Sequence, residues 1–216
     1  MSTDTEHEKR LAADAAAALV EDGMTVGLGT GSTVGYFLPA LAARDLDLRC
    51  VATSPATETA ALEAGLEVVA FDDSGSTTVD LAVDGADQVA PDAWVVKGGG
   101  GAHTREKIVA AAADRFLVIV SSDKIVERVQ APVPLELLRF GLAATLAELE
   151  EARLRDAPPT PDGGVLADWV GPVDDPAGLS ARLAETPGVV EHGLFAPDLV
   201  SEILVGRGES VERRPS

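Results

Sequence analysis

The sequence predicts an α/β fold in which a parallel sheet is covered by helices on both faces and is followed by a second, smaller α+β domain. Apolar strand-like runs alternate with helical segments from Met24 to Val120, and strands that are apolar throughout are typical of parallel sheets with two buried faces. Glycine-rich or acidic loops follow several of these runs. Beyond Val129, Pro132 and Pro134 interrupt the alternation, so we expect the second domain to begin near residue 130.

The first expected domain opens with a helix. The alanine-rich run 8–22 has strong helix propensity, and Gly23 is well placed to end it. The apolar spacing from Tyr36 to Ala42 predicts a second helix. By the same criteria, strands are expected at 24–28, 48–52, 66–71, 80–83, 94–96 and 116–120, and further helices at 56–63 and 104–113.

The second expected domain, residues 130–197, has the order helix, strand, helix, strand. Residues 135–155 predict one long amphipathic helix. A turn and strand at 163–168, a helix at 179–185 and a last strand within 188–195 follow. Ser201–Val205 is expected to be a further strand that returns to the first domain, which then comprises residues 1–129 and 198–216.

The chain is strongly acidic, with a net charge of -19 at neutral pH and a sequence pI near 4.3. A field of this sign repels phosphodiester backbones, which argues against nucleic acid as a partner and requires any phosphate to be held locally. The depletion of lysine favours adaptation to salt, which screens self-repulsion. An ordinary acidic protein from a GC-rich genome is the alternative. Of the 17 basic residues, four are lysines: Lys9, Lys97, Lys107 and Lys124.

Cysteine content and apolar patterning indicate the compartment. The single cysteine, Cys50, excludes an intramolecular disulfide and a structural zinc site of four thiolates, which fits a reducing cytoplasm. The charged N-terminus, residues 1–10, does not resemble a signal peptide. Since no apolar run reaches the length of a membrane span, we expect a cytoplasmic protein without a membrane partner.

The first candidate site is Gly29-Thr30-Gly31-Ser32-Thr33, between an expected strand and an expected helix. Glycines let backbone amides face an anion, and the start of a helix adds positive potential. The segment lacks the spacing of a Walker loop and of a dinucleotide fingerprint. A phosphate cradle and a tight turn in which Ser or Thr caps the helix both remain open.

The second candidate is Asp84-Gly85-Ala86-Asp87, directly after an apolar strand. The carboxyl ends of parallel strands are where such folds bind ligands, and carboxylates there can contact sugar hydroxyls. The alternative is a pair of loop aspartates that accept hydrogen bonds from backbone amides.

The third candidate runs from Lys97 through four consecutive glycines, Gly98 to Gly101, to Lys107. Four glycines carry an entropic cost that a simple connector would not require, so close approach to this backbone is expected. Thr104 is the expected helix N-cap, which places Glu106 in the first turn. Glu106 is then either a general base that faces the glycines or a carboxylate that only interacts favourably with the helix dipole.

The fourth candidate, Ser121-Ser122-Asp123-Lys124, follows the strand ending at Val120. A solvated lysine is the simplest interpretation of Lys124. However, two of only four lysines, Lys97 and Lys124, lie at strand ends beside glycines or acids. This placement favours anion binding.

In their order and spacing, these four segments together resemble type A ribose-5-phosphate isomerases. Two later segments, Pro132–Glu136 and Pro187–Phe195, are also similar to that family, so the resemblance covers nearly the whole chain. It implies a Rossmann-like catalytic domain with a small α+β domain of the ferredoxin-like type. It further implies interconversion of ribose 5-phosphate and ribulose 5-phosphate through an enediolate in the pentose phosphate pathway, without metal or redox cofactor, by a homodimer or homotetramer.

The resemblance implies roles for individual residues. Glu106 matches the family's general base, which moves a proton between C2 and C1. Asp84 and Asp87 match acids that contact the sugar and assist ring opening, and Lys97 matches the cation near the reacting oxygens. Gly101 and His103 depart from the family pattern, and His103 is assigned no role. The implied substrate-binding positions are Lys9, Thr30, Gly31, Ser32, Thr33, Asp84, Gly85, Ala86, Asp87, Lys97, Gly98, Gly99, Gly100 and Lys124.

Two other functions compete with this one. An amino-sugar-phosphate deaminase of similar architecture would be expected to show a catalytic histidine arrangement that this sequence lacks. A sugar-phosphate sensor of the kind found in transcriptional repressors would carry a basic helix-turn-helix, and no such segment precedes Gly29. The presence of Glu106 as well as a phosphate-type loop at 29–33 favours chemistry over sensing.

Overall fold

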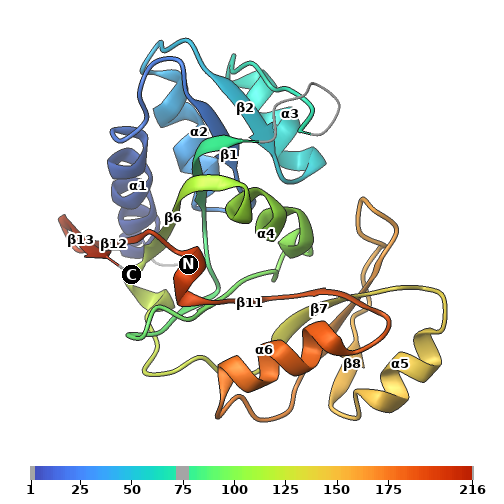
Figure 1. The fold of residues 1–216 in the computed structure, drawn as a ribbon. Helices are drawn as coiled ribbons and strands as arrows, with labels where there is room; N and C mark the ends of the chain where they lie inside the picture. Colours follow the sequence, from blue (N-terminus) through green and yellow to red (C-terminus); the bar gives the residue numbers. More distant parts are fainter. Residues whose placement is uncertain (1–2, 72–77, 216) are drawn as a thin grey trace. The chain divides into compact units, whose positions relative to one another are not determined.

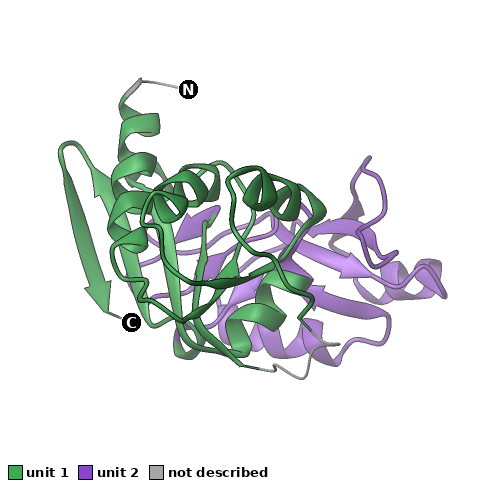
Figure 2. Ribbon diagram, turned by 90° about the horizontal axis from the view of Figure 1, so that it is seen from above, with its two compact units in different colours: residues 1–86, 105–125, 198–216 green, residues 87–104, 126–197 purple. Residues whose placement is uncertain are grey.

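A computed structural model describes residues 3–71 and 78–215 of the chain. The chain divides into two compact units (Figure 2): unit 1 is Met1–Ala86, Arg105–Ile125 and Asp198–Ser216, and unit 2 is Asp87–Thr104 and Val126–Pro197. The domain boundaries expected from the sequence, at 129 and 198, differ from this division mainly in residues 87–104. These residues were expected in the first domain and belong to unit 2. Within the described ranges, none of the helices combines the length and apolarity needed to cross a bilayer.

Unit 1 is built on a six-stranded sheet in the order β13-β12-β6-β3-β1-β2 (Figure 1). All neighbours pair in parallel except β12 and β13, which are antiparallel. This confirms the Rossmann-like parallel sheet and the expected return of the strand near Ser201–Val205. The strands are β1 (Thr25–Leu28), β2 (Arg49–Ala52), β3 (Val79–Asp84), β6 (Ala113–Ser121), β12 (Glu202–Arg207) and β13 (Ser210–Pro215).

Small residues let the first helix pack closely on this sheet. Helix α1 (Thr3–Ala17) lies against α2, β6 and β12 (Figure 1), and its alanines Ala12, Ala13 and Ala16 are fully buried. The helix ends at Ala17, not at Asp22 as expected, because the chain turns there and buries Val20 in the core. The other helices are α2 (Val34–Ala42), α3 (Pro55–Glu63), α4 (His103–Ala111) and the short 3-10 helix η1 (Ser122–Lys124).

The segment 66–71 does not form the strand expected there. Val68 makes only an isolated bridge to Cys50, in which the amide of Cys50 bonds to the Glu67 carbonyl and the amide of Val69 to the Cys50 carbonyl. Only Leu66 of the segment is buried, so little apolar burial is available to extend the pairing along the edge strand β2.

Unit 2 contains a four-stranded antiparallel sheet in the order β10-β7-β9-β8. Two helices separate its strands in the sequence order strand, helix, strand, strand, helix, strand, which is the ferredoxin-like arrangement. Unit 2 also contains a separate, smaller sheet of order β11-β5-β4. The elements are β4 (Gln88–Val89), β5 (Val95–Val96), β7 (Val133–Leu137), α5 (Leu142–Glu148), β8 (Ala152–Leu154), β9 (Val165–Trp169), α6 (Pro176–Glu185), β10 (Val189–His192) and β11 (Leu194–Phe195). The 3-10 helix η2 (Pro197–Leu199) follows where the chain returns to unit 1.

The long helix expected at 135–155 is wrong. The segment instead gives the end of β7, the short helix α5 and strand β8. Strand β7 lies between β9 and β10, and all five of its residues are buried, so the segment lacks the exposed polar face of an amphipathic helix. Gly141, with φ +73°, adopts a left-handed conformation directly before α5 and separates the two elements.

Glu8 fastens α1 to two other segments of unit 1. Its Oε2 accepts hydrogen bonds from the amide (2.9 Å) and hydroxyl (2.7 Å) of Ser122, and its Oε1 accepts one from the amide of Gly208 (2.9 Å). Burial raises the pKa of this carboxyl, but the three hydrogen bonds outweigh burial and hold the pKa below its usual value. The ionised carboxylate therefore holds η1 and the β12–β13 turn in place.

Replacing Glu8 with alanine is expected to lower the free energy of unfolding by about 2 kcal/mol, since three donors lose a charged acceptor. The pKa of Glu8 is lowered on folding from 4.5, so its ionic contribution is complete above that pH and is lost as the pH falls through the folded value. Urea unfolding of both proteins between neutral pH and about pH 3 tests this. A stability difference that stayed constant over this range would contradict it.

Candidate active site

The glycine loop of unit 1, residues 29–33, connects β1 to α2. The amide of Gly29 bonds to the carbonyl of Val83 at 2.9 Å, and the amide of Thr30 donates to Oδ1 of Asp84 at 3.0 Å. Thr33 is the N-cap residue of α2 but makes no side-chain capping hydrogen bond. The capping alternative is therefore wrong for Thr33, and the loop is fixed instead by the end of β3.

Three hydroxyl groups from the loop that follows β2 and the start of α3 brace Thr30. The Thr30 hydroxyl lies within hydrogen-bonding distance of the hydroxyls of Thr53 (3.0 Å), Ser54 (2.9 Å) and Thr57 (3.2 Å). The Thr57 hydroxyl also donates to the carbonyl of Gly29 at 2.8 Å. Sequence reasoning did not identify these residues. Their position after a parallel strand, at the sheet edge where ligands bind, was the available signal.

Asp84 ends β3 and is almost fully buried, with 3% of its surface exposed. Its Oδ1 accepts the amides of both Thr30 (3.0 Å) and Gly85 (2.7 Å). As one of the two interpretations of the sequence expected, Asp84 accepts hydrogen bonds from backbone amides. Through these two bonds, Asp84 fixes the glycine loop and the residue that follows β3.

Glu106 lies in the first turn of α4 and is 5% exposed. The helix begins at His103, so Thr104 is inside the first turn and is not the N-cap that the sequence indicated. A buried carboxylate near a helix N-terminus is stabilised in its charged form by the helix dipole. The position of Glu106 is therefore compatible with both interpretations of the sequence, a general base and a carboxylate that only interacts with the helix dipole.

The two predicted lysines of unit 1 have acidic neighbours. Lys124, in η1, has its Nζ 3.6 Å from Oδ2 of Asp123 and is about one-third exposed. Burial raises the pKa of Asp123, but the Ser121 hydroxyl and Lys124 outweigh it and lower the pKa. Lys9, in α1, is buried and donates to Oε1 of Glu6 at 2.9 Å.

Unit 2 contains Lys97 and the glycine turn, defined as residues 98–101. Lys97 is 2% exposed, its amide bonds to the carbonyl of Gly193 at 2.9 Å, and its Nζ lies 5.5 Å from the centre of the Phe195 ring. The amide of Gly99 donates to Oδ2 of Asp87 at 2.8 Å. The second aspartate therefore also accepts a backbone amide, and it belongs to the same unit as the turn.

Close packing explains two features of the glycine turn. Gly98 has φ +99°, and a Cβ there would lie 2.6 Å from Nδ1 of His103, whose side chain is fully buried. Gly101 has φ +76°, and a Cβ there would lie 2.6 Å from Leu166. Gly101 and His103, the two positions that depart from the family pattern, therefore both take part in the close packing of this turn.

The structure brings together the glycine loop with Asp84 in unit 1, and Asp87 with the glycine turn in unit 2. The chain passes between the units at Ala86–Asp87 and at Thr104–Arg105. Of the predicted site residues, unit 1 carries Lys9, Thr30, Gly31, Ser32, Thr33, Asp84, Gly85, Ala86, Glu106 and Lys124, and unit 2 carries Asp87, Lys97, Gly98, Gly99 and Gly100.

Related sequences agree on one family. The family model described as ribose 5-phosphate isomerase A (phosphoriboisomerase A) matches residues 49–210. Ribose-5-phosphate isomerase A of Caulobacter vibrioides is 46% identical to the chain, and the alignment covers 95% of this chain and 96% of that protein. The protein of the same name from Natronomonas pharaonis is 42% identical, with 97% of each chain covered.

Solved structures agree with the sequences. A D-ribose-5-phosphate isomerase in complex with phospho-erythronic acid is similar with a TM-score of 0.92 and 33% identity, over 99% of this chain and 100% of that one. Ribose 5-phosphate isomerase A of Methanocaldococcus jannaschii has a TM-score of 0.90 and 32% identity, over 96% and 98% of the two chains. Sequence and fold together show that this chain belongs to the ribose 5-phosphate isomerase A family.

Proposed function

We propose that this chain interconverts D-ribose 5-phosphate and D-ribulose 5-phosphate. The observation that carries the proposal is the hydrogen bond from Thr30 to Asp84 at 3.0 Å. It joins a phosphate-type glycine loop to a carboxylate at the carboxyl edge of a parallel sheet, where such folds bind ligands. A family relative in complex with phospho-erythronic acid supports it, because that ligand carries both a phosphate and a carboxylate.

The chemistry follows from the residue types. A base removes the proton from C2 of the open-chain aldose while the C1 oxygen gains a proton, which gives the enediol. The C2 hydroxyl then loses its proton as the base returns a proton to C1, which gives the ketose. Glu106 is the proposed base, since its buried carboxylate can accept and return one proton. Lys97 supplies the cation that stabilises the enediolate charge, and Asp84 and Asp87 bind sugar hydroxyls and assist ring opening.

The phosphate is proposed to bind to the glycine loop, residues 30–33, with Lys124 and Lys9 as cationic partners. Support comes from hydrogen bonds that link the segments carrying the two lysines. Glu8, next to Lys9, accepts hydrogen bonds from the amide and the hydroxyl of Ser122, which lies two residues before Lys124. Local cations are needed because the net charge of the chain is -19.

No metal or redox cofactor is needed in this proposal. The reaction moves hydrogen within one substrate, so there is no net oxidation, and a lysine cation can stabilise the intermediate charge. We further propose a cytoplasmic homodimer or homotetramer, as symmetric assemblies are common among such enzymes. The acidic composition, with halophilic relatives such as that of Natronomonas pharaonis, supports activity at high salt.

The direct test is ribulose 5-phosphate formation from ribose 5-phosphate by the purified chain, at low and molar salt, with a chelator present throughout. We expect turnover that persists with the chelator and increases with salt. Binding of ribose 5-phosphate without turnover at any salt concentration would reject the isomerase and favour a sugar-phosphate sensor. Activity that the chelator abolishes would reject the metal-free mechanism.

A further inference from the structure

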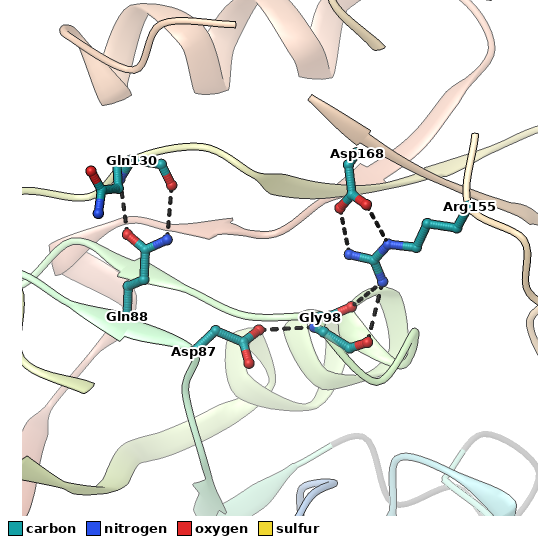
Figure 3. A network of polar contacts seen from close by, with 7 residues as sticks. Asp87, Gln88, Gly98, Gln130, Arg155 and Asp168 are labelled. Atoms are coloured by element: carbon teal, nitrogen blue, oxygen red, sulfur yellow. Dashed lines mark hydrogen bonds and ion pairs between the residues drawn. The ribbon is translucent and has the colours of Figure 1, made fainter. Parts of the chain in front are cut away.

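The guanidinium of Arg155 is held on one edge by a carboxylate of unit 2 (Figure 3). Its Nε donates to Oδ2 of Asp168 at 2.7 Å and its Nη2 to Oδ1 at 2.5 Å. The side chains are 19% and 21% exposed, so solvent screens the pair only in part. This two-point geometry fixes both the position and the plane of the guanidinium.

The remaining nitrogen of Arg155 reaches the glycine turn (Figure 3). Nη1 donates to the carbonyl oxygens of Gly98 at 3.0 Å and Gly99 at 3.2 Å. The Gly99 amide in turn donates to Asp87 at 2.8 Å. The turn is therefore held from two directions by side chains that come from separate segments of unit 2.

Asp87 is itself anchored in the backbone. Its amide bonds to the carbonyl of Val96 at 2.8 Å, the residue before Lys97. The side chain of the next residue, Gln88, bonds to the carbonyl (2.8 Å) and the amide (2.9 Å) of Gln130 (Figure 3). A shift of the glycine turn would thus act on Asp87 through the Gly99 bond and on Lys97 through the chain.

Charge and entropy indicate what this arrangement does. Asp168 neutralises Arg155, so the pair is poorly suited to bind a phosphate. Glycines lose more conformational freedom on folding than other residues, and four in succession need external contacts to stay in one conformation. A fixed donor shared by two successive carbonyls supplies such a contact.

We propose that Arg155, oriented by Asp168, is a positioning residue that holds the glycine turn and through it Asp87 and Lys97. The inference rests on the proposed isomerase function, in which Asp87 binds the sugar and Lys97 stabilises the enediolate. Lysine cannot replace Arg155, because a single ammonium cannot make the parallel pair of bonds to Asp168 and still reach both carbonyls.

Arg153 offers a matched control in the same segment. It lies in β8, two residues before Arg155, and its Nη1 also donates to backbone carbonyls, those of Glu150 (2.6 Å) and Ala152 (2.8 Å). These carbonyls belong to its own segment and not to the glycine turn. Arg153→Met therefore removes the same charge and, like the Arg155 variants, two hydrogen bonds to backbone carbonyls, but it does not release the turn.

The test compares wild type with Arg155→Lys, Arg155→Met, Asp168→Asn and Arg153→Met. We expect kcat to fall by about 10- to 100-fold in Arg155→Lys and Arg155→Met, the size of loss that a displacement near 1 Å can cause, and less in Asp168→Asn. Arg153→Met should keep the kcat of wild type. Amide hydrogen exchange of the peptide that contains residues 98–101 should accelerate in the Arg155 variants and not in Arg153→Met.

Three outcomes would overturn the positioning role. The first is an Arg155→Met protein with the kcat of Arg153→Met, and the second is a loss of kcat that the unfolded fraction, measured by circular dichroism, fully explains. The third is reduced kcat with unchanged exchange in the glycine turn. If wild type does not turn over ribose 5-phosphate, the proposed function fails, whereas an active wild type with active Arg155 variants rejects only the positioning role.

Discussion

Replacing Glu106 with glutamine is expected to lower kcat for ribose 5-phosphate isomerisation by about 10²- to 10⁴-fold, the range that general acid–base catalysis contributes. Glutamine has nearly the size of glutamate and keeps an acceptor oxygen, but it cannot accept and return a proton at neutral pH. Glu106 is 5% exposed within the first turn of α4, and because the change conserves the side-chain volume, the fold should tolerate it at this buried position. Steady-state kinetics with a binding measurement for ribose 5-phosphate separate lost turnover from lost affinity.

Glu58 provides the control for the helix-dipole interpretation of Glu106. It occupies the first turn of α3, which has nine residues like α4, but it is exposed. Glu58→Gln should change stability by only a few tenths of a kcal/mol and leave kcat unchanged. If Glu106→Gln behaves like Glu58→Gln, the dipole interpretation is correct and another group must move the proton.

Exchange of the transferred hydrogen gives a second test of the same residue. Wild type should incorporate solvent deuterium into the product at C1 when Glu106 exchanges its proton with water during the reaction. The Glu106→Gln protein should lose incorporation in proportion to its loss of kcat. Deuterium incorporation at the wild-type rate in this variant would point to a different base.

Those parts of the fold that depend on local sequence were predictable. The runs around Val26, Leu81 and Ile119 are apolar on both faces, and this pattern requires a sheet covered on both sides. The ends of such strands are the ligand-binding edge, so the positions of Thr30 and Asp84 followed from the strand assignments alone.

The remaining parts depend on contacts between distant residues. Leu135, Leu138 and Leu142 have the spacing of one helix face, whereas Leu135 and Leu137 have the spacing of one strand face. Only the pairing of this segment with β9 and β10 decides between the two. Helix α1 ends at Ala17 because Val20 packs into the core, which propensity does not encode. Arg155 carries no sequence signal at all, since its significance lies in two carbonyls 56 and 57 residues away along the chain.

Replacing Gly29 with alanine is expected to cause a loss of kcat/KM of about 10²-fold or more. A Cβ at this position would lie 2.0 Å from Cγ and 2.1 Å from Oδ1 of Asp84, so the carboxylate must move. Asp84 is 3% exposed and bonds to the amides of Thr30 and Gly85, hence its displacement would also disturb the glycine loop. Overpacking of this kind should lower the free energy of unfolding by about 1–3 kcal/mol.

Gly35 is the matched control, because it lies six residues later, is exposed in the first turn of α2, and a Cβ there meets no atom within 4 Å. Gly35→Ala should stabilise the helix by up to about 1 kcal/mol and leave kcat/KM unchanged. Kinetics and urea unfolding of both variants separate the effect on Asp84 from a general effect of adding a methyl group. If Gly29→Ala keeps wild-type kcat/KM, the position of Asp84 is not critical for the reaction, and its proposed contact with the sugar must be abandoned.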